Sequence, residues 1–205
     1  RFASTRNSYD VAGRLTSVES GELASWSSEG TNPSSWSGFS VFQRTDTVYD
    51  AQNRKIKDIV SSAGTTYNVT QYTYDAVGRL QCTAVRMNPA AFGSVPSDAC
   101  SLGALGPNGA DRITKNLYNA AGQLTTVQKA VGTALAQNYV SYSYWQNGPK
   151  KSVMDANGNL SEMDYDGYDR LKYLYFPSKS ATGSSSRGEA QADFEQYNYD
   201  LNGNR

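Results

Sequence analysis

The side chains of this sequence that could do acid–base chemistry are carboxylates, because the 205 residues include 19 Asp and Glu, two Cys and no His. Histidine is the commonest general base and the commonest metal ligand, so its absence excludes Ser-His and Cys-His hydrolases. Two cysteines without histidine also cannot assemble the usual tetrahedral zinc site. We therefore expect no catalytic residue, no metal ion and no cofactor in this chain.

A pair of carboxylates, as in glycoside hydrolases, is the catalytic chemistry that remains open. Asp164 and Asp166 lie close together on one predicted strand, but a solvated strand face explains that spacing equally well. Most other aspartates recur in a repeated turn, where they have a structural role. We expect that the chain is not an enzyme. Turnover of a polysaccharide that depends on one of these carboxylates would contradict this expectation.

The two cysteines are candidates for a disulfide. Cys82 and Cys100 lie 18 residues apart and bracket most of a segment rich in Pro, Gly and Ala, residues 87–111. A bridge would close this loop and stabilise the fold by about 3 kcal/mol in the chain-entropy model. Two free thiols, one in a strand and one in a loop, are the alternative. The bridge is our expectation, and it fits an oxidising compartment.

One heptad recurs eight times along the chain, which indicates a repeat architecture. The copies are YDVAGRL from Tyr9, YDAQNRK from Tyr49, YDAVGRL from Tyr74, YNAAGQL from Tyr118, YWQNGPK from Tyr144, MDANGNL from Met154, YDGYDRL from Tyr165 and YDLNGNR from Tyr199. The repeating unit is near twenty to twenty-five residues, with insertions. Residues 24–38, which contain Trp26 and Trp36, and residues 87–111 break the rhythm and should be surface excursions.

The columns of the heptad predict a hairpin turn. After the tyrosine comes a residue whose short side chain can accept backbone N–H groups, with Trp145 as the exception. These residues are Asp10, Asp50, Asp75, Asn119, Asp155, Asp166 and Asp200. The fifth column holds residues that tolerate positive φ. They are Gly13, Asn53, Gly78, Gly122, Gly148, Gly158, Asp169 and Gly203. An Asx-initiated turn closed by a left-handed residue is typical of a hairpin connection.

The first and last columns predict contacts across each strand pair. Tyrosine enters the turn, and a leucine leaves it in five copies, at Leu15, Leu80, Leu124, Leu160 and Leu171. We expect the tyrosines to pack in the core and across strands; stacking on carbohydrate is the alternative. Basic residues follow the left-handed position at Arg14, Arg54, Arg79 and Arg170. We expect them to form exposed ion pairs with the motif aspartates, worth roughly 0–1 kcal/mol, and to discourage edge association.

Other turn signals fall between the motif copies. Turns of the opposite sheet edge are expected at Ser20-Gly21, Ala63-Gly64, Val131-Gly132 and residues 178–188. The short step between Met154 and Tyr165 leaves room for a single strand near residues 159–164. The best helix candidate, residues 188–194, should form one helical turn at most.

Composition supports an all-β fold, since 15 Tyr and 18 Gly favour strands and tight turns. Nineteen basic residues balance nineteen acidic ones, so we expect neither a nucleic acid nor an anionic membrane surface as partner. No run of about 18 apolar residues predicts a membrane span. The chain opens at Arg1 and stops inside a motif copy, which suggests a piece of a longer polypeptide without an export signal of its own.

The heptad Y-D-x-x-G-R-L resembles the RHS, or YD, repeat, fully at Tyr9 and Tyr74, closely at Tyr165 and Tyr199, and partly elsewhere. The resemblance covers nearly the whole chain. That family includes bacterial polymorphic toxins, C components of insecticidal toxin complexes and teneurins. The resemblance implies one continuous array over residues 1–205, with tandem β-hairpins in a curved sheet that is a section of a hollow shell. The resemblance says nothing about a cargo, because the sequence carries no Asp-Pro-x-Gly signature, no toxin tail and no plug domain.

The resemblance predicts a structural role. The chain would be a wall segment of a shell that encloses or presents a toxin, or an extracellular stalk, within a bacterial secreted or cell-surface protein. Its partners would be neighbouring repeats of the same polypeptide, other copies through strand edges, or an enclosed toxin domain. A carbohydrate- or cell-surface-binding repeat module is the alternative, since aromatic-glycine repeats also occur in choline and glycan binders. Those modules expose paired aromatics, and an Arg-Leu pair has no place in their pattern.

Overall fold

The computed structural model describes residues 1–26, 30–32 and 35–205, and in these it is an all-β protein of thirteen strands, as the composition predicts. The strands are β1 (Phe2–Tyr9), β2 (Leu15–Leu23), β3 (Phe39–Tyr49), β4 (Lys55–Ser62), β5 (Thr65–Tyr74), β6 (Leu80–Arg86), β7 (Arg112–Tyr118), β8 (Leu124–Lys129), β9 (Gln137–Tyr144), β10 (Lys150–Asp155), β11 (Leu160–Tyr165), β12 (Leu171–Tyr175) and β13 (Phe194–Gln196). A 3₁₀ helix, η2 (Pro89–Ser94), follows β6. No described helix is long and apolar enough to cross a membrane.

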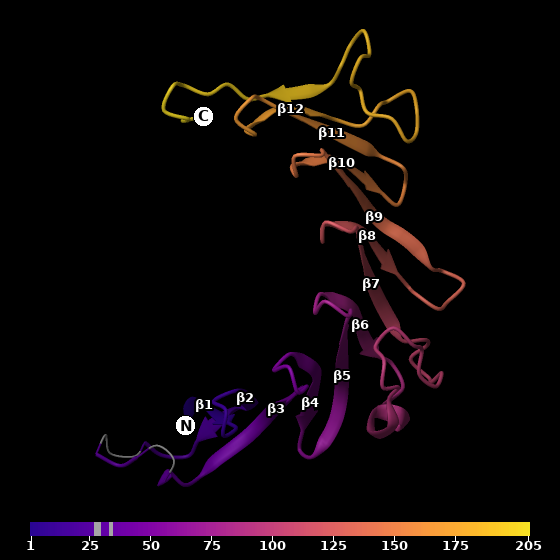
Figure 1. Cartoon of the computed structure of the whole chain (residues 1–205). Coiled ribbons are helices and arrows are strands. Elements are labelled where there is room, and N and C mark those ends of the chain that lie inside the picture. Colours follow the sequence, from indigo (N-terminus) through magenta and orange to yellow (C-terminus); the bar gives the residue numbers. More distant parts are fainter. Residues whose placement is uncertain (27–29, 33–34) are drawn as a thin grey trace. The chain divides into compact units, whose positions relative to one another are not determined.

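The chain divides into two compact units, residues 1–114 and residues 115–205. The first contains β1 to β6, η2 and the start of β7; the second contains the rest of β7 and β8 to β13. Within each unit, strands that follow one another along the chain pair antiparallel (Figure 1). Each unit is therefore a meander of hairpins, the arrangement that the tandem motif predicts.

Motif copies connect consecutive strands. The copy from Tyr9 joins β1 to β2, and the later copies join β3 to β4, β5 to β6, β7 to β8, β9 to β10 and β11 to β12. A register shift precedes the tyrosine, so Tyr9 lies opposite Leu15, and Tyr74 lies opposite Leu80. Such a shift marks a β-bulge, which bends the strand into the turn. The tyrosine and leucine that flank these turns are thus cross-strand partners.

The opposite sheet edge carries shorter or looser connections. Ala63 and Gly64, with φ of 46° and 79°, form the two-residue turn between β4 and β5. The copy from Met154 also lies at this edge, because it joins β10 to β11 directly after the motif turn between β9 and β10. Its position explains why Tyr165 of the next copy follows Met154 so closely in sequence, since only the strand β11 separates the two turns.

The expected turn at Ser20-Gly21 is wrong. Both residues lie inside β2, where the register against β3 shifts between them. A side chain at Gly21 would place a Cβ only 2.0 Å from the carbonyl oxygen of Ser40. Glycine is present here because β3 approaches closely, and close backbone approach is the other common reason for a glycine in a strand.

The best helix candidate, residues 188–194, forms no helix: it contains turns and irregular segments, and β13 begins at Phe194. The helix η2 lies instead in the second insertion. It begins after Asn88, whose side-chain oxygen accepts the N–H of Ala90 (3.2 Å), and Pro89 occupies its first position. Proline is favoured there because the first N–H of a helix has no intrahelical acceptor.

The core of the first unit is small, and most of it lies where the second insertion covers the sheet. Val69 of β5 and Cys82 and Ala84 of β6 are fully buried, together with Ala99 of the insertion. Residues 87–111 therefore pack on the sheet rather than extending away from it. The first insertion, residues 24–38, lies partly outside the described residues.

Candidate functional site

All eight motif copies form one and the same turn. In the copy from Tyr9, the N–H of Asp10 donates to the carbonyl of Arg14 (3.0 Å), and the N–H of Gly13 donates to the carbonyl of Asp10 (3.0 Å). The corresponding pairs recur in the other seven copies at 2.9–3.1 Å. The fifth position has positive φ throughout, between 59° and 113°. The repeat is thus a defined hairpin turn and not only a similarity of letters.

The motif aspartate organises the turn through both of its oxygens. In the first copy, Oδ1 of Asp10 accepts the N–H groups of Ala12 (2.9 Å) and Arg14 (3.0 Å), and Oδ2 accepts Nε of Arg14 (2.7 Å). The copies at Asp50, Asp75 and Asp166 repeat these three bonds. In the copies at Asp155 and Asp200 an asparagine donates in place of the arginine. These carboxylates have a structural role because they hold backbone and guanidinium groups.

The left-handed position should be intolerant of β-branched residues. Gly78 has φ of 87°, so Gly78→Val should lower the free energy of unfolding by about 1 kcal/mol or more. Gly167→Val is the matched control, since Gly167 lies two residues after a motif tyrosine, the place that Val11 fills in the first copy. Urea unfolding measures both. Equal losses in the two variants would contradict the turn assignment.

The motif aspartates should make stability depend on pH. The backbone N–H of Arg14 holds the pKa of Asp10 below its usual value, and the Arg170 side chain does so for Asp166. A lowered folded-state pKa contributes stability that is present above the unfolded value of about 4 and is lost as the pH falls through the folded value. We expect the melting temperature to drop below about pH 4. Asp166→Asn should melt below wild type at neutral pH, with a difference that shrinks in acid. A difference that is constant with pH would refute this role.

The motif arginines do more than the expected exposed ion pairs. The guanidinium of Arg14 lies 5.0 Å from the ring centre of Tyr49, the tyrosine of the next copy, and its Nη1 donates to Asn53 Oδ1 (2.6 Å). Arg54 lies over Tyr74 (4.6 Å) in the same way. Arg170 lies over Tyr199 (4.5 Å). Each of these arginines therefore contacts its own turn and the tyrosine of the following repeat.

The motif tyrosines make a contact that the sequence did not reveal. Tyr49 donates its hydroxyl hydrogen to the carbonyl of Leu15 (2.9 Å), the last residue of the preceding motif at the same sheet edge. The same bond, at 2.7–2.9 Å, joins Tyr74 to Lys55, Tyr144 to Leu124, Tyr165 to Lys150 and Tyr199 to Leu171. We call this series the tyrosine ladder. One signal for it was present, since seven of the eight copies carry Tyr and none carries Phe.

In the copy from Tyr144, Trp145 occupies the position of the Asx residue. The turn of this copy forms by backbone hydrogen bonds alone. The N–H of Trp145 donates to the carbonyl of Pro149 (2.9 Å), and its indole Nε1 donates to the carbonyl of Met163 (3.1 Å) on β11. The indole thus reaches the neighbouring hairpin. In other copies, the motif arginines and tyrosines likewise contact the neighbouring repeat.

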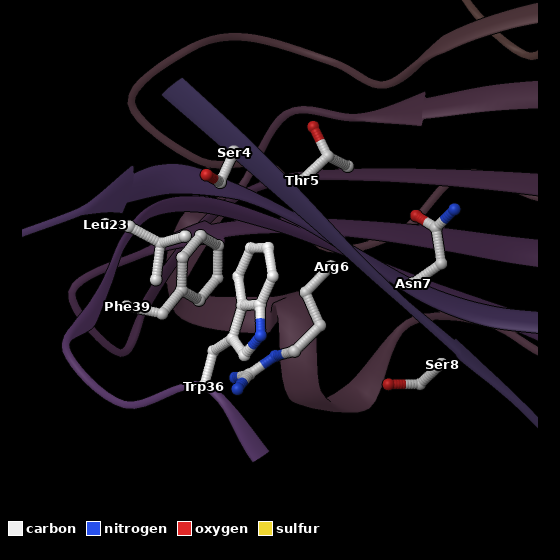
Figure 2. A pocket seen from close by; sticks show the side chains of 8 residues that line it. All are labelled: Ser4, Thr5, Arg6, Asn7, Ser8, Leu23, Trp36 and Phe39. Carbon is white, nitrogen blue, oxygen red and sulfur yellow. The ribbon is translucent and has the colours of Figure 1, made fainter. Parts of the chain in front are cut away.

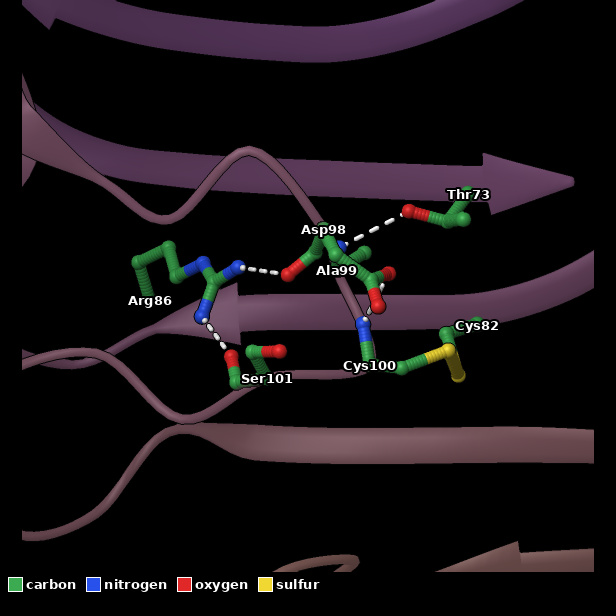
Figure 3. Close-up of a disulfide and its surroundings, with 7 residues drawn as sticks. All are labelled: Thr73, Cys82, Arg86, Asp98, Ala99, Cys100 and Ser101. Atoms are coloured by element: carbon green, nitrogen blue, oxygen red, sulfur yellow. Dashed lines mark hydrogen bonds between the residues drawn. A yellow bond between two sulfur atoms is a disulfide. The ribbon is translucent and has the colours of Figure 1, made fainter.

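The second insertion is fastened to the sheet by a disulfide between Cys82 and Cys100 (Figure 3). The N–H of Ala99 donates to Thr73 Oγ1 (2.8 Å), which joins the insertion to β5. The amide of Gln71, also on β5, donates to the carbonyl of Pro96 (2.7 Å). Covalent and hydrogen-bonded contacts therefore fix the loop over β5 and β6.

A buried ion pair lies beneath this insertion. Arg86 and Asp111 meet at 2.7 Å, and their side chains are only 2% and 4% exposed. Arg86 also donates to Gln71 Oε1. Figure 3 shows its further bonds to the carbonyls of Ser101 and Asp98. Burial alone would raise the pKa of Asp111, but hydrogen bonds from Arg86, Met87 and Gly103 hold that pKa below its usual value. Sequence patterns did not single out either residue.

The two carboxylates considered for catalysis are each paired with an arginine. Asp164 lies 2.8 Å from Arg187, and Asp166 is bound by Arg170 as in the other motif turns. Among residues 1–26, 30–32 and 35–205, no group of three metal-ligating side chains gathers. The arrangement of these groups stabilises turns and strand ends.

No protein-family model matches the chain, and no curated protein matches it. Among solved structures, it is similar to a crystal structure of TcdB2-TccC3 without the hypervariable C-terminal region, with 17% identity and a TM-score of 0.41 over 85% of this chain and 9% of that one. It is also similar to a structure of the Photorhabdus luminescens Tc holotoxin pore with a mutated TccC3, with 15% identity and a TM-score of 0.44 over 98% of this chain and 10% of that one.

The chain spans about a tenth of the length of these structures. Identities and TM-scores this low carry no activity and no partner over to it. The heptad is observed in the sequence of this chain, and the hairpin turn that its eight copies share is observed in the structure. On that motif, the chain resembles the YD repeats of the RHS type.

Proposed function

We propose that the chain is a structural wall segment of an RHS-type shell. In this role it encloses or presents a toxin, or it forms an extracellular stalk, as part of a larger exported bacterial protein. The observation that carries the proposal is the tyrosine ladder, in which a motif tyrosine donates to the last carbonyl of the preceding motif. A side chain used in this way joins repeat to repeat and is withdrawn from ligand binding.

The motif arginines support the same role. Arg14 and Arg54 each lie over the ring of the next tyrosine while their Nε groups hold the aspartates of their own turns. Cation–π contacts of this kind contribute about 0.5–1 kcal/mol each at exposed sites. Each such contact between neighbouring repeats adds a small stabilising free energy, and the stability of a repeat protein is approximately the sum of these contributions and those of the single repeats.

The first strand supports the proposal that further repeats are the partners. Tyr9 is 60% exposed, and its hydroxyl has no hydrogen-bond partner among the described residues. By the geometry of the tyrosine ladder, a preceding YD repeat would supply the carbonyl that Tyr9 lacks and an arginine over its ring. That repeat belongs to the same polypeptide or to another copy.

The disulfide supports an exported location. Bridges such as Cys82–Cys100 form and persist in oxidising compartments, and they are rare in the cytosol. A role as a carbohydrate-binding repeat module fits the motif less well, because five motif tyrosines use their hydroxyls within the fold.

Sedimentation velocity over a range of concentrations tests the wall role. We expect wild type to associate as concentration rises, because a free strand edge is a template for another strand. Tyr9→Ala should weaken this association. Tyr168→Ala, which removes an 83% exposed ring outside the tyrosine ladder, should leave it unchanged. A chain that stays monomeric at every concentration would overturn the proposal.

A further inference from the structure

A pocket of about 580 Å³ lies beside the first strand, apart from the motif turns (Figure 2). Its polar side is a run of β1, residues 4–8, and its apolar side is formed by Leu23, Trp36 and Phe39. This volume falls in the range of about 300–1,000 Å³ that is usual for small-molecule sites. None of the repeat contacts described for the motif uses these side chains.

The aromatic side of the pocket is held in place and is partly open to solvent. Trp36 donates its indole Nε1 hydrogen to the carbonyl of Thr31 (3.0 Å), which fixes the ring. Trp26 lies 5.4 Å from Trp36 between ring centres, and Phe2 lies 5.6 Å from Trp26. Trp26 remains 57% exposed. A cluster of rings with exposed members offers flat apolar faces to a ligand.

Arg6 is a positioned donor on the polar side. Its Nε donates to Glu19 Oε2 (2.6 Å), and its guanidinium lies 5.1 Å from the ring centre of Phe39. Glu19 is only 6% exposed, so it anchors the arginine firmly. Among the described residues, no acceptor is bound to the Nη groups of Arg6. Figure 2 shows its guanidinium beside the indole of Trp36.

Charge balance indicates the class of ligand. Glu19 also binds Arg44 (3.1 Å), which in turn binds Asp46 (2.6 Å), so these two arginines and two carboxylates sum to zero. A phosphate or sulfate would find no excess positive charge here. An apolar peptide would leave the Nη groups of Arg6 and the hydroxyl of Ser8 without partners, and burying such groups unpaired is unfavourable.

We propose that this pocket binds a neutral pyranose unit of a glycan. A pyranose has C–H faces that carry slight positive charge and suit the negative face of an aromatic ring. Its hydroxyls both donate and accept, which matches the Arg6 donors and the hydroxyl of Ser8, which lies on the same face of β1 as Arg6 (Figure 2). The site adds a binding activity to the wall segment, and it lies between β1 and the first insertion rather than on the motif tyrosines.

Tryptophan fluorescence of the whole chain tests the proposal. In a Trp145→Phe background, the remaining indoles are Trp36, which lines the pocket, and Trp26, which packs against Trp36. Neutral hexoses, N-acetylhexosamines and their short oligomers are titrated beside uronates and inorganic phosphate. We expect a saturable change with a neutral sugar and none with phosphate.

Variants assign the response to the pocket. Ser8→Ala should weaken binding about three- to tenfold, the loss expected for one hydrogen bond. Arg6→Lys, which keeps the charge but loses the planar fork, should also weaken it. Tyr168→Ala is the control and should bind as the parent does. Circular dichroism confirms that each variant is folded.

No saturable response to any neutral sugar would overturn the proposal, as would a stronger response to phosphate or uronate. A response unchanged by both Ser8→Ala and Arg6→Lys would also overturn it. The wall role is judged separately, by self-association. A chain that associates without binding sugar contradicts only the pocket, and a monomer that binds sugar contradicts only the wall role.

Discussion

Arg86→Met is expected to lower the free energy of unfolding of residues 1–114 by about 3–5 kcal/mol, because it leaves the buried carboxylate of Asp111 without its counter-charge. The same change removes donors from the carbonyls of Ser101 and Asp98, which hold the second insertion. Guanidinium unfolding followed by the fluorescence of Trp26 and Trp36, in a Trp145→Phe background, measures the first unit.

Two further variants test the cause of this loss. Arg86→Met with Asp111→Asn should recover part of the stability, since the unpaired charge is gone while one acceptor oxygen remains. Arg1→Met removes an exposed ion pair with Glu22 and should cost at most about 1 kcal/mol. A loss for Arg86→Met no larger than for Arg1→Met would show that the buried pair does not stabilise the unit.

Cys82→Ala with Cys100→Ala is expected to lower the free energy of unfolding by about 3 kcal/mol, because the bridge closes a loop of 18 residues. Alanine suits the fully buried position of Cys82, where a serine hydroxyl would need a partner. Denaturant unfolding of oxidised wild type, reduced wild type and the variant gives the comparison.

Thiol titration of the unfolded chain provides an independent check. Protein made under oxidising conditions should show no reactive thiol until a reductant is added, and two afterwards. Two reactive thiols before reduction would rule out the bridge. Reduced wild type and the double variant should unfold at similar denaturant concentrations, since both lack the covalent constraint.

The turns were predictable from sequence because their chemistry is local. An aspartate that accepts N–H groups two and four residues on, and a glycine with positive φ, act within one heptad. A search along the sequence detects such constraints at every copy. The same locality explains why the hairpin order and the single strand between Met154 and Tyr165 followed from the spacing.

Contacts between distant segments were not predictable in this way. The bond from Tyr49 to Leu15 spans 34 residues, and the pair of Arg86 and Asp111 spans 25. Gly21 was misassigned as a turn because a glycine that admits a neighbouring strand looks the same in sequence as one that reverses the chain. Only the paired strand, known from the structure, distinguishes the two.

The order of the strands has a consequence for how such a chain becomes native. Within each unit every strand pairs with the one just before it, as β2 does with β1 and β3 with β2. Folding can therefore advance in one direction, with each hairpin adding to those already formed. A polypeptide that emerges end first from a ribosome or an export channel never has to wait for a distant segment, and low contact order of this kind favours rapid folding.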